Sequence, residues 1–276
     1  MDDIPLPVAS GFAGIEGARL YYEVFGAGQP LVLLHAGWLD RRIWDPQIPA
    51  LASRFLVIRY DLRGFGRSTM PDAPYSDVQD LRALLGALDV GRATLVGLSL
   101  GGTVAIDFAL ANPAMVAGLA LVGPGLRGYS PSPEDDSTDR TAAMIQAVRA
   151  GDREGALDLF VELWVDGPDR QAAPELRLHV RSMAAEYSFA HLVEGAPAPI
   201  ALPSAIERLS SIRAPTLLVA GTADQAAILE IVGLLEVEIP GARRVLIPDA
   251  AHLVNLEQPE RFNQVLLEFL ELEARD

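Results

Sequence analysis

A serine placed between two glycines constrains the fold of this chain more than any other feature. Ser99 stands two residues after Gly97 and two residues before Gly101. The apolar run over residues 93–96 is typical of a short buried strand, and residues 103–111 are typical of a helix. We therefore expect Ser99 on a tight turn from strand to helix, where a Cβ atom at either glycine position would clash.

The same turn places two groups that suit nucleophilic chemistry. The hydroxyl of Ser99 is pushed outward, and the backbone N–H of Leu100 lies in the first turn of the helix, without an intrahelical acceptor. Such N–H groups bind anions. Because the chain contains 24 glycines, the bare pattern can also arise by chance. The interpretation of Ser99 as a nucleophile therefore requires a histidine and an acid farther along the chain.

Strand-like and helix-like segments alternate along most of the chain. The expected strands are residues 11–15, 19–25, 31–34, 55–60, 93–96, 116–122, 216–220 and 243–247. The expected helices of this part are residues 44–53, 78–88, 103–111, 227–239 and 259–271. The first two strands form a hairpin, and the later alternation predicts an α/β fold with a mostly parallel central sheet flanked by helices.

The alternation stops between residue 123 and about residue 214. This stretch begins with an acidic, proline- and serine-rich segment at residues 129–139 and contains no strand-like run. Its expected helices are residues 141–150, 153–165, 174–187 and 204–211. We therefore expect residues 1–123 and 215–276 to form the core and residues 124–214 to form a helical insertion.

Charge and composition restrict the partners of the chain. A net charge of −15 disfavours nucleic acid and anionic membranes. The absence of cysteine excludes disulfides and thiol catalysis, and all 22 basic residues are arginine, which excludes a lysine Schiff base. Residues 1–7 do not have the pattern of a signal peptide, and no apolar run is long enough to span a membrane. We expect a cytoplasmic protein.

A serine nucleophile needs a base, and imidazole is best matched to that role at neutral pH. Two of the four histidines, His179 and His191, lie in the insertion and are expected to be surface or packing residues. His252 follows the last expected strand, at the carboxyl edge of the sheet, where ligands of open α/β sheets bind. We interpret His252 as the base.

The base in turn needs a carboxylate that fixes its tautomer. Asp224 stands four residues after the expected strand 216–220, at the same edge of the sheet. Asp249 is nearer to His252 in sequence, but it directly follows its own strand, and we expect a structural role for it. Asp224 is therefore the preferred acid.

Five pieces of the sequence together resemble the α/β-hydrolase superfamily over nearly the full length of the chain. They are His35-Ala36-Gly37-Trp38, Asp61-Leu62-Arg63-Gly64-Phe65-Gly66-Arg67-Ser68, Gly97-Leu98-Ser99-Leu100-Gly101, Gly221-Thr222-Ala223-Asp224 and His252-Leu253-Val254-Asn255-Leu256-Glu257-Gln258-Pro259. The order Ser99, Asp224, His252 is the order of that superfamily. A minority of its members carry the acid after the sixth strand, where this chain has Gly123-Pro124-Gly125. The resemblance implies that the insertion is a cap between the sixth and seventh strands.

Acyl transfer also needs backbone donors that converge on the oxyanion. We expect these donors to be the N–H groups of Leu100 and of Gly37, in the loop after the third strand. In the resembling families the position of His35 supports that loop and transfers no proton. The family usually has glycine where this chain has Ala36 and Ala251, so both loops depart from the pattern in detail.

The cap implied by the resemblance would form most of the substrate pocket. Trp38 and Trp164 are candidate pocket residues, whereas Met144, Phe160 and Met183 are expected mainly between the helices of the insertion. The arginines of the insertion are expected to be solvated surface charges: Arg127, Arg140, Arg149, Arg153, Arg170, Arg177, Arg181, Arg208 and Arg213. An apolar pocket suited to neutral substrates follows from this distribution.

Together these features predict a serine carboxylesterase for small to medium apolar esters. Ser99 forms the acyl-enzyme, His252 is the general base, Asp224 orients it, and no metal or organic cofactor is implied. Haloalkane dehalogenases and epoxide hydrolases are disfavoured, because they carry aspartate in place of Ser99. An enol-lactone hydrolase, a C–C bond hydrolase and a cofactor-free perhydrolase share the triad. A low-turnover binding or signalling protein also fits, and we expect a monomer or homodimer.

Overall fold

A single sheet organises the chain. The structure, a computed structural model, describes residues 4–132, 135, 137–192 and 196–273. Within this part the strands are β1 (Ala9–Ile15), β2 (Ala18–Phe25), β3 (Gln29–Leu34), β4 (Phe55–Tyr60), β5 (Ala93–Leu98), β6 (Val116–Val122), β7 (Thr216–Gly221) and β8 (Arg243–Ile247). Their order across the sheet is β1-β2-β4-β3-β5-β6-β7-β8.

Most neighbouring strands are parallel. Strands β1 and β2 form an antiparallel hairpin, β2 pairs antiparallel with β4, and the strands from β4 across to β8 run parallel. Strands β3, β5, β6 and β7 are almost wholly buried, which explains their continuous apolar runs. Because β4 and β5 lie on opposite sides of β3, the chain changes direction across the sheet between β3 and β5. Ligands of open α/β sheets bind at such a switch point.

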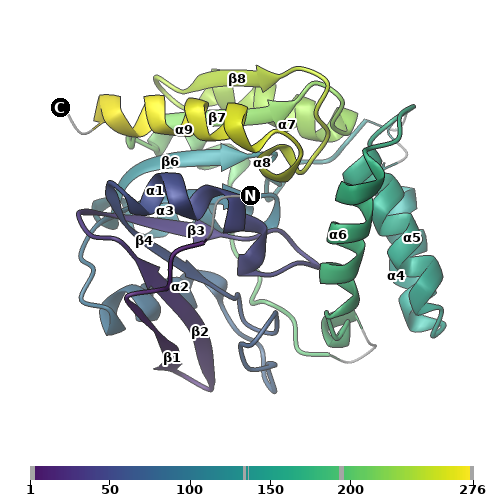
Figure 1. Cartoon of the computed structure of the whole chain (residues 1–276), viewed down its shortest axis with the longest axis horizontal. Coiled ribbons are helices and arrows are strands. Elements are labelled where there is room, and N and C mark those ends of the chain that lie inside the picture. The colour runs from purple at the N-terminus through teal and green to yellow at the C-terminus, as the bar shows by residue number, and fades with distance from the viewer. Residues whose placement is uncertain (1–3, 133–134, 136, 193–195, 274–276) are drawn as a thin grey trace.

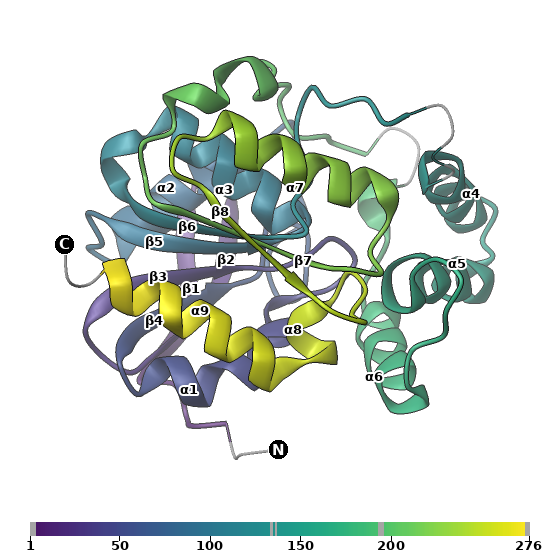
Figure 2. The same cartoon turned by 90° about the horizontal axis from the view of Figure 1, so that it is seen from above.

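Helices cover both faces of the sheet. They are η1 (Arg41–Gln47), α1 (Ile48–Ala52), α2 (Asp77–Ala87), α3 (Leu100–Ala111), η2 (Pro113–Met115), α7 (Ala226–Glu238), α8 (Val254–Glu257) and α9 (Pro259–Glu273). Helices α2, α3 and α7 lie on one face, and α1 and α9 lie on the other (Figure 2). The expected α/β fold with a mostly parallel sheet is confirmed.

The chain between β6 and β7 is helical. It contains α4 (Ser137–Arg149), α5 (Arg153–Val161), the π-helical turn η3 (Glu162–Asp166), α6 (Pro174–Ala185), η4 (Ala190–Leu192) and η5 (Ile206–Ser211). Helices α4, α5 and α6 stand beside the sheet, at the end toward which the arrows of β6 and β8 point (Figure 1). The insertion therefore lies next to the carboxyl ends of the parallel strands. The domain limits at residues 124 and 214 stay a prediction.

Some local predictions were wrong. The expected helix 153–165 ends as an α-helix at Val161 and continues as the π-helical turn η3. The expected helix 44–53 begins as the 3₁₀ helix η1, which contains Pro46, and continues as α1. The expected helix 204–211 is the 3₁₀ helix η5. Parts of the segments 1–7 and 129–139 lie outside the described residues.

Among the residues that the structure describes, no helix has both the length and the apolar character needed to cross a bilayer.

Candidate active site

Ser99 occupies the turn from β5 to α3 in a strained backbone conformation. Its φ is 53° and its ψ is −113°, which costs a residue with a side chain about 1–3 kcal/mol. A Cβ atom at Gly97 would lie 2.3 Å from the carbonyl oxygen of Gly101, and one at Gly101 would lie 2.3 Å from that of Leu34. Both glycines therefore permit the close approach of α3 to β3 and β5 that holds Ser99 in place.

The side chain of Ser99 is not used to hold the helix. Within α3, which the structure describes in full, its hydroxyl makes no capping hydrogen bond. Leu100 is the first residue of α3, so its N–H has no intrahelical acceptor. Gly37, in the loop after β3, lies beside the side chain of Leu100. The N–H groups of Leu100 and Gly37 thus belong to one small region next to Ser99.

His252 and Asp224 form a buried hydrogen-bonded pair. The Nδ1 atom of His252 lies 3.0 Å from Oδ2 and 3.1 Å from Oδ1 of Asp224, and their side chains are 3 % and 1 % exposed. The carboxylate is an acceptor, so Nδ1 carries the proton and Nε2 is left as an acceptor. Oδ1 of Asp224 also accepts the N–H of Gln225 at 2.8 Å.

The other ring nitrogen of His252 is not used to hold the fold. Its Nε2 atom is buried and has no hydrogen-bond partner within the described part of the chain. The imidazole and Ser99 line the same cavity. His252, with a ring nitrogen that has no partner, and Ser99 thus line one cavity, as a base and its nucleophile would.

The structure gives a steric reason for the glycine at the end of β6. Gly123 has a φ of +46°, and a Cβ atom there would lie 3.0 Å from Nδ1 of His252 and 3.2 Å from Oδ2 of Asp224. A carboxylate at this position would need the space that the pair occupies. Asp249 lies exposed, and its backbone N–H donates to the hydroxyl of Thr222.

The cavity beside Ser99 is small and mostly apolar. Its volume is about 160 Å³. Its apolar lining consists of Ala36, Trp38, Leu39, Leu100, Met144, Phe160, Trp164 and Leu253. The other lining residues are Gly37, Ser99, Thr141 and His252, so among the described residues no Asp, Glu or Arg lines it. A charged group bound here would lose its hydration without gaining an ionic partner.

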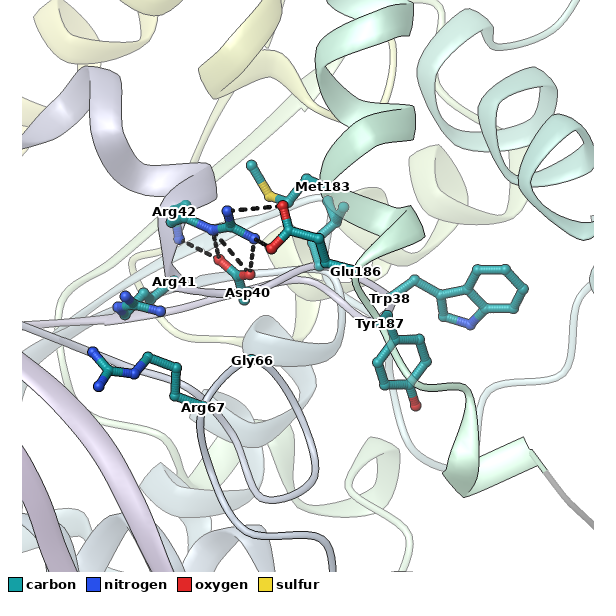
Figure 3. Close-up of a pocket in the computed structure, with 10 residues that line it drawn as sticks. Trp38, Asp40, Arg41, Arg42, Gly66, Arg67, Met183, Glu186 and Tyr187 are labelled. Carbon is teal, nitrogen blue, oxygen red and sulfur yellow. Dashed lines mark hydrogen bonds and ion pairs between the residues drawn. The ribbon is translucent and has the colours of Figure 1, made fainter. Parts of the chain in front are cut away.

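Trp38 and Leu39 line both this cavity and a second, more polar pocket of about 200 Å³. The φ of Trp38 is 65°, and its indole stacks on Phe160 with centroids 5.3 Å apart. In the second pocket, Arg42 donates to both Asp40 and Glu186 (Figure 3). This ion pair joins the loop after β3 to the residue that follows α6. These two carboxylates, with the hydrogen bonds that they accept, raise the pKa of Arg42.

The side chain of His35 stabilises the loop that contains Gly37 through two hydrogen bonds. Its ring is fully buried, Nδ1 donates to the carbonyl of Ala36 at 2.7 Å, and Nε2 accepts the N–H of Leu62 at 2.9 Å. Burial lowers the pKa of His35 below its ordinary value of 6.5, so the ring stays neutral. A neutral ring can make both of these bonds, whereas an imidazolium could not accept from Leu62.

We expect His35 to make the stability of the protein fall in mild acid. Below about pH 6.5, His35 binds a proton in the unfolded chain but not in the folded protein. This difference lowers the free energy of unfolding by at most about 2 kcal/mol at pH 5. His35→Gln should lose less stability than the parent protein between pH 7.5 and pH 5 in urea unfolding. Equal losses in the two proteins would contradict this role of His35.

The remaining histidines lie away from the cavity. His179 is exposed on α6. His191 lies where the insertion meets the core: its Nε2 is 3.1 Å from the carbonyl oxygen of Arg63, and its ring stacks on Phe65. Burial lowers the pKa of His191. His191 thus links the insertion to the core through a hydrogen bond and a ring stack.

The expectation that the arginines of the insertion are solvated surface charges is wrong for several of them. The side chains of Arg127, Arg170 and Arg177 are only 34 %, 23 % and 28 % exposed, and each pairs with a carboxylate. Arg153 donates to the carbonyl groups of residues 185 and 187. These partners could not be predicted from the residues next to each arginine, because most of the partners are distant in the chain.

A sequence model described as the alpha/beta hydrolase family matches residues 31–265 of this chain. The chain belongs to that family. Among curated proteins, this α/β hydrolase is 30% identical over 255 residues to RutD of Azorhizobium caulinodans, a protein named as a putative carbamate hydrolase. That match covers 91% of this chain and 95% of RutD.

Two solved structures extend the comparison. A thermophilic esterase from Thermogutta terrifontis is 28% identical to this α/β hydrolase, with a TM-score of 0.79 and coverage of 98% of this chain and 99% of the esterase. An enol-lactonase from Burkholderia xenovorans LB400 is 26% identical, with a TM-score of 0.79 and coverage of 95% and 100%. Hydrolases that are named for different acyl substrates thus share the fold of this α/β hydrolase.

Proposed function

We propose that this α/β hydrolase is a serine esterase for small neutral esters. Ser99 is the nucleophile, His252 the general base and Asp224 the group that orients it. The N–H groups of Gly37 and Leu100 stabilise the oxyanion. The insertion acts as a cap that covers the cavity. The observation that carries this proposal is the buried pair of Asp224 and His252: His252 lines the same cavity as Ser99, and its Nε2 has no other hydrogen-bond partner within the described residues.

In the proposed reaction, Oγ of Ser99 attacks the ester carbonyl while Nε2 of His252 takes its proton. The negative charge on the carbonyl oxygen is stabilised by the N–H groups of Gly37 and Leu100. Collapse of this intermediate breaks the bond to the alcohol, which leaves with the proton from His252. Water, deprotonated by His252, then hydrolyses the acyl-enzyme and restores Ser99.

Size and polarity of the cavity support the choice of substrate. At about 160 Å³ it is smaller than the roughly 300–1,000 Å³ of pockets for drug-sized ligands. Its indole, phenyl and thioether groups suit a short alkyl chain, and Thr141 is the polar lining residue outside the proposed machinery. The net charge of −15 also repels anions from the surface. A short, neutral acyl or alkoxy group fits these conditions.

We expect ethyl butyrate to be a better substrate than monoethyl succinate, in which a carboxylate replaces the terminal methyl group. The expected ratio of kcat/KM is at least about tenfold, since burying a carboxylate without a partner costs more than the about 1.4 kcal/mol to which that ratio corresponds. Both esters should be assayed at low and at moderate salt, since salt screens the long-range repulsion.

A matched variant tests the cause of this preference. Thr141→Arg adds a cation to the lining of the cavity, and it should narrow the ratio between the two esters. Faster hydrolysis of the succinate ester by the parent protein at both salt concentrations would contradict the neutral pocket. It would instead favour a hydrolase of acidic lactones or esters.

A further inference from the structure

One short segment of the insertion contacts both loops that carry the proposed acid and base. The segment covers residues 163–170 and includes most of the π-helical turn η3. π-Helical turns are rare and are frequently found at functional sites. The α-helix α5 ends at Val161, and the segment that follows it makes several contacts with the core.

The first contact is between two rings. The indole of Trp164 lies against the imidazole of His252, with ring centroids 4.5 Å apart and planes inclined by 44°. An indole at this distance limits the tilt of the imidazole and keeps water from its face. It also stabilises the imidazolium that forms when His252 takes a proton, because aromatic faces attract cations within about 6 Å.

The second contact reaches the loop of the acid. Gln225 is 3 % exposed, and its side-chain amide donates to the carbonyl of Leu163 at 2.6 Å. Its backbone N–H donates to Oδ1 of Asp224. The position of Leu163 is thus coupled to a hydrogen bond that holds the carboxylate of Asp224.

The third contact reaches the loop of the base. Arg170 forms a two-pronged ion pair with Glu257, and their side chains are 23 % and 13 % exposed. Oε2 of Glu257 also accepts the backbone N–H of Ala251, the residue before His252, at 2.8 Å. Arg170 therefore fixes a carboxylate that in turn fixes the backbone next to His252.

A glycine allows these contacts to coexist. Gly167 has a φ of +78°, and a Cβ atom there would lie 2.3 Å from the carbonyl oxygen of Ala223 and 3.1 Å from the Cβ atom of Ala251. The segment consequently packs directly on the residues that precede Asp224 and His252.

We propose that residues 163–170 position the acid and the base, so that the insertion takes part in catalysis as well as in substrate selection. Trp164 acts on the imidazole, Leu163 acts through Gln225, and Arg170 acts through Glu257. This inference rests on the proposed function. Leu163 and Arg170 are outside the lining of the cavity, so their role does not require contact with a substrate.

Arg170→Ala tests the positioning role, with Arg181→Ala as the matched control. Arg181 also lies in the insertion and pairs with carboxylates, but its partners Glu154 and Asp158 are on α5, away from the cavity. Arg170→Ala should lower kcat by about tenfold or more and change KM by less than about threefold. Arg181→Ala should change neither by more than about twofold.

A spectroscopic measurement follows the same variants without any substrate. The hydrogen-bonded proton on Nδ1 of His252 should give a low-field NMR signal that exchanges slowly with water. Its assignment follows from its loss in His252→Asn. Exchange should be at least about tenfold faster in Arg170→Ala than in the parent protein, because the loop of His252 opens more often. In Arg181→Ala it should be unchanged.

Two variants of Trp164 separate the ring contact from simple packing. Trp164→Phe keeps an aromatic face beside His252 and should retain most of the parent kcat, whereas Trp164→Leu should lose about tenfold. Circular dichroism and the unfolding midpoint report whether each variant is folded. If Trp164→Leu does not fold, the comparison of Arg170→Ala with Arg181→Ala still decides the question.

The positioning role is overturned if Arg170→Ala keeps the parent kcat and the parent exchange rate. It is also overturned if Arg170→Ala and Arg181→Ala lose kcat equally. Failure of the proposed function looks different: the parent protein would not hydrolyse esters, while the proton on Nδ1 would still be protected and Arg170→Ala would still expose it. That outcome would support positioning of His252 and reject the esterase.

Discussion

Replacement of Ser99 by alanine is expected to lower kcat for ester hydrolysis by about 10⁶-fold. The expected loss is that large because removal of the nucleophile from a serine triad costs about as much as removal of the whole triad. The fold should survive, since the hydroxyl makes no capping bond within α3. We expect a change in the free energy of unfolding of no more than about 0.5 kcal/mol.

The measurement combines initial rates on ethyl butyrate with urea unfolding of the parent protein and Ser99→Ala. Thr103→Ser is a suitable control on the same helix, because it keeps the hydroxyl that lies 3.4 Å from the carbonyl oxygen of Ser99. The control should retain activity within about threefold. A Ser99→Ala protein with more than about one per cent of the parent kcat would mean that another group or water attacks the ester directly.

Replacement of Asp224 by asparagine is expected to lower kcat by about 10⁴-fold, as the same change does in a serine protease. Asparagine has nearly the same size, but its NH₂ group can face Nδ1 of His252 and favour the wrong tautomer. Nε2 then carries the proton and cannot accept one from Ser99. The Nδ1 contact of 3.0 Å and the burial of both side chains make this dependence strong.

Asp249→Asn is the matched control for this variant. Asp249 is exposed and follows β8 directly, and we expect its replacement to change kcat by less than about twofold. If Asp224→Asn retains more than about a tenth of the parent activity, the acid lies elsewhere. A larger loss in Asp249→Asn would assign the role to Asp249.

The core of the fold was predictable because its signals are local. The strands Phe55–Tyr60, Val116–Val122 and Arg243–Ile247 were expected with the observed bounds, since each is a short apolar or alternating run between clear breaks. The turn at Ser99 was predictable for a steric reason. The contacts that a Cβ atom would make at Gly97 and Gly101 are those that a tight strand-to-helix turn requires.

Features that depend on distant pairs were not predictable. Local periodicity does not indicate that β4 lies between β2 and β3, because strand order is decided by packing across the sheet. The ion pair of Arg170 with Glu257 joins residues that are 87 positions apart in the chain. Asp169, next to Arg170 in the sequence, suggested a local partner instead. The π-helical turn was missed for the same reason, since its contacts lie with Gln225 and His252.

The left-handed backbone of Trp38 also escaped prediction. Glycine or asparagine usually signals such a conformation, and tryptophan does not. Here the conformation is held by the stack on Phe160 and by an edge contact with Phe189 at 4.7 Å. Trp38 was a candidate pocket residue because of its place beside Gly37, not because of its geometry.

The most direct test of the account is covalent labelling with a fluorophosphonate, followed by intact-mass and peptide analysis. We expect one phosphonate per chain, attached to Oγ of Ser99, no label in Ser99→Ala and much slower labelling in Asp224→Asn. Labelling of Ser99 without measurable ester turnover would point to a binding protein with a retained triad. Ester turnover with Ser99 unlabelled, or with the label on another residue, would contradict the central claim that Ser99 is the nucleophile.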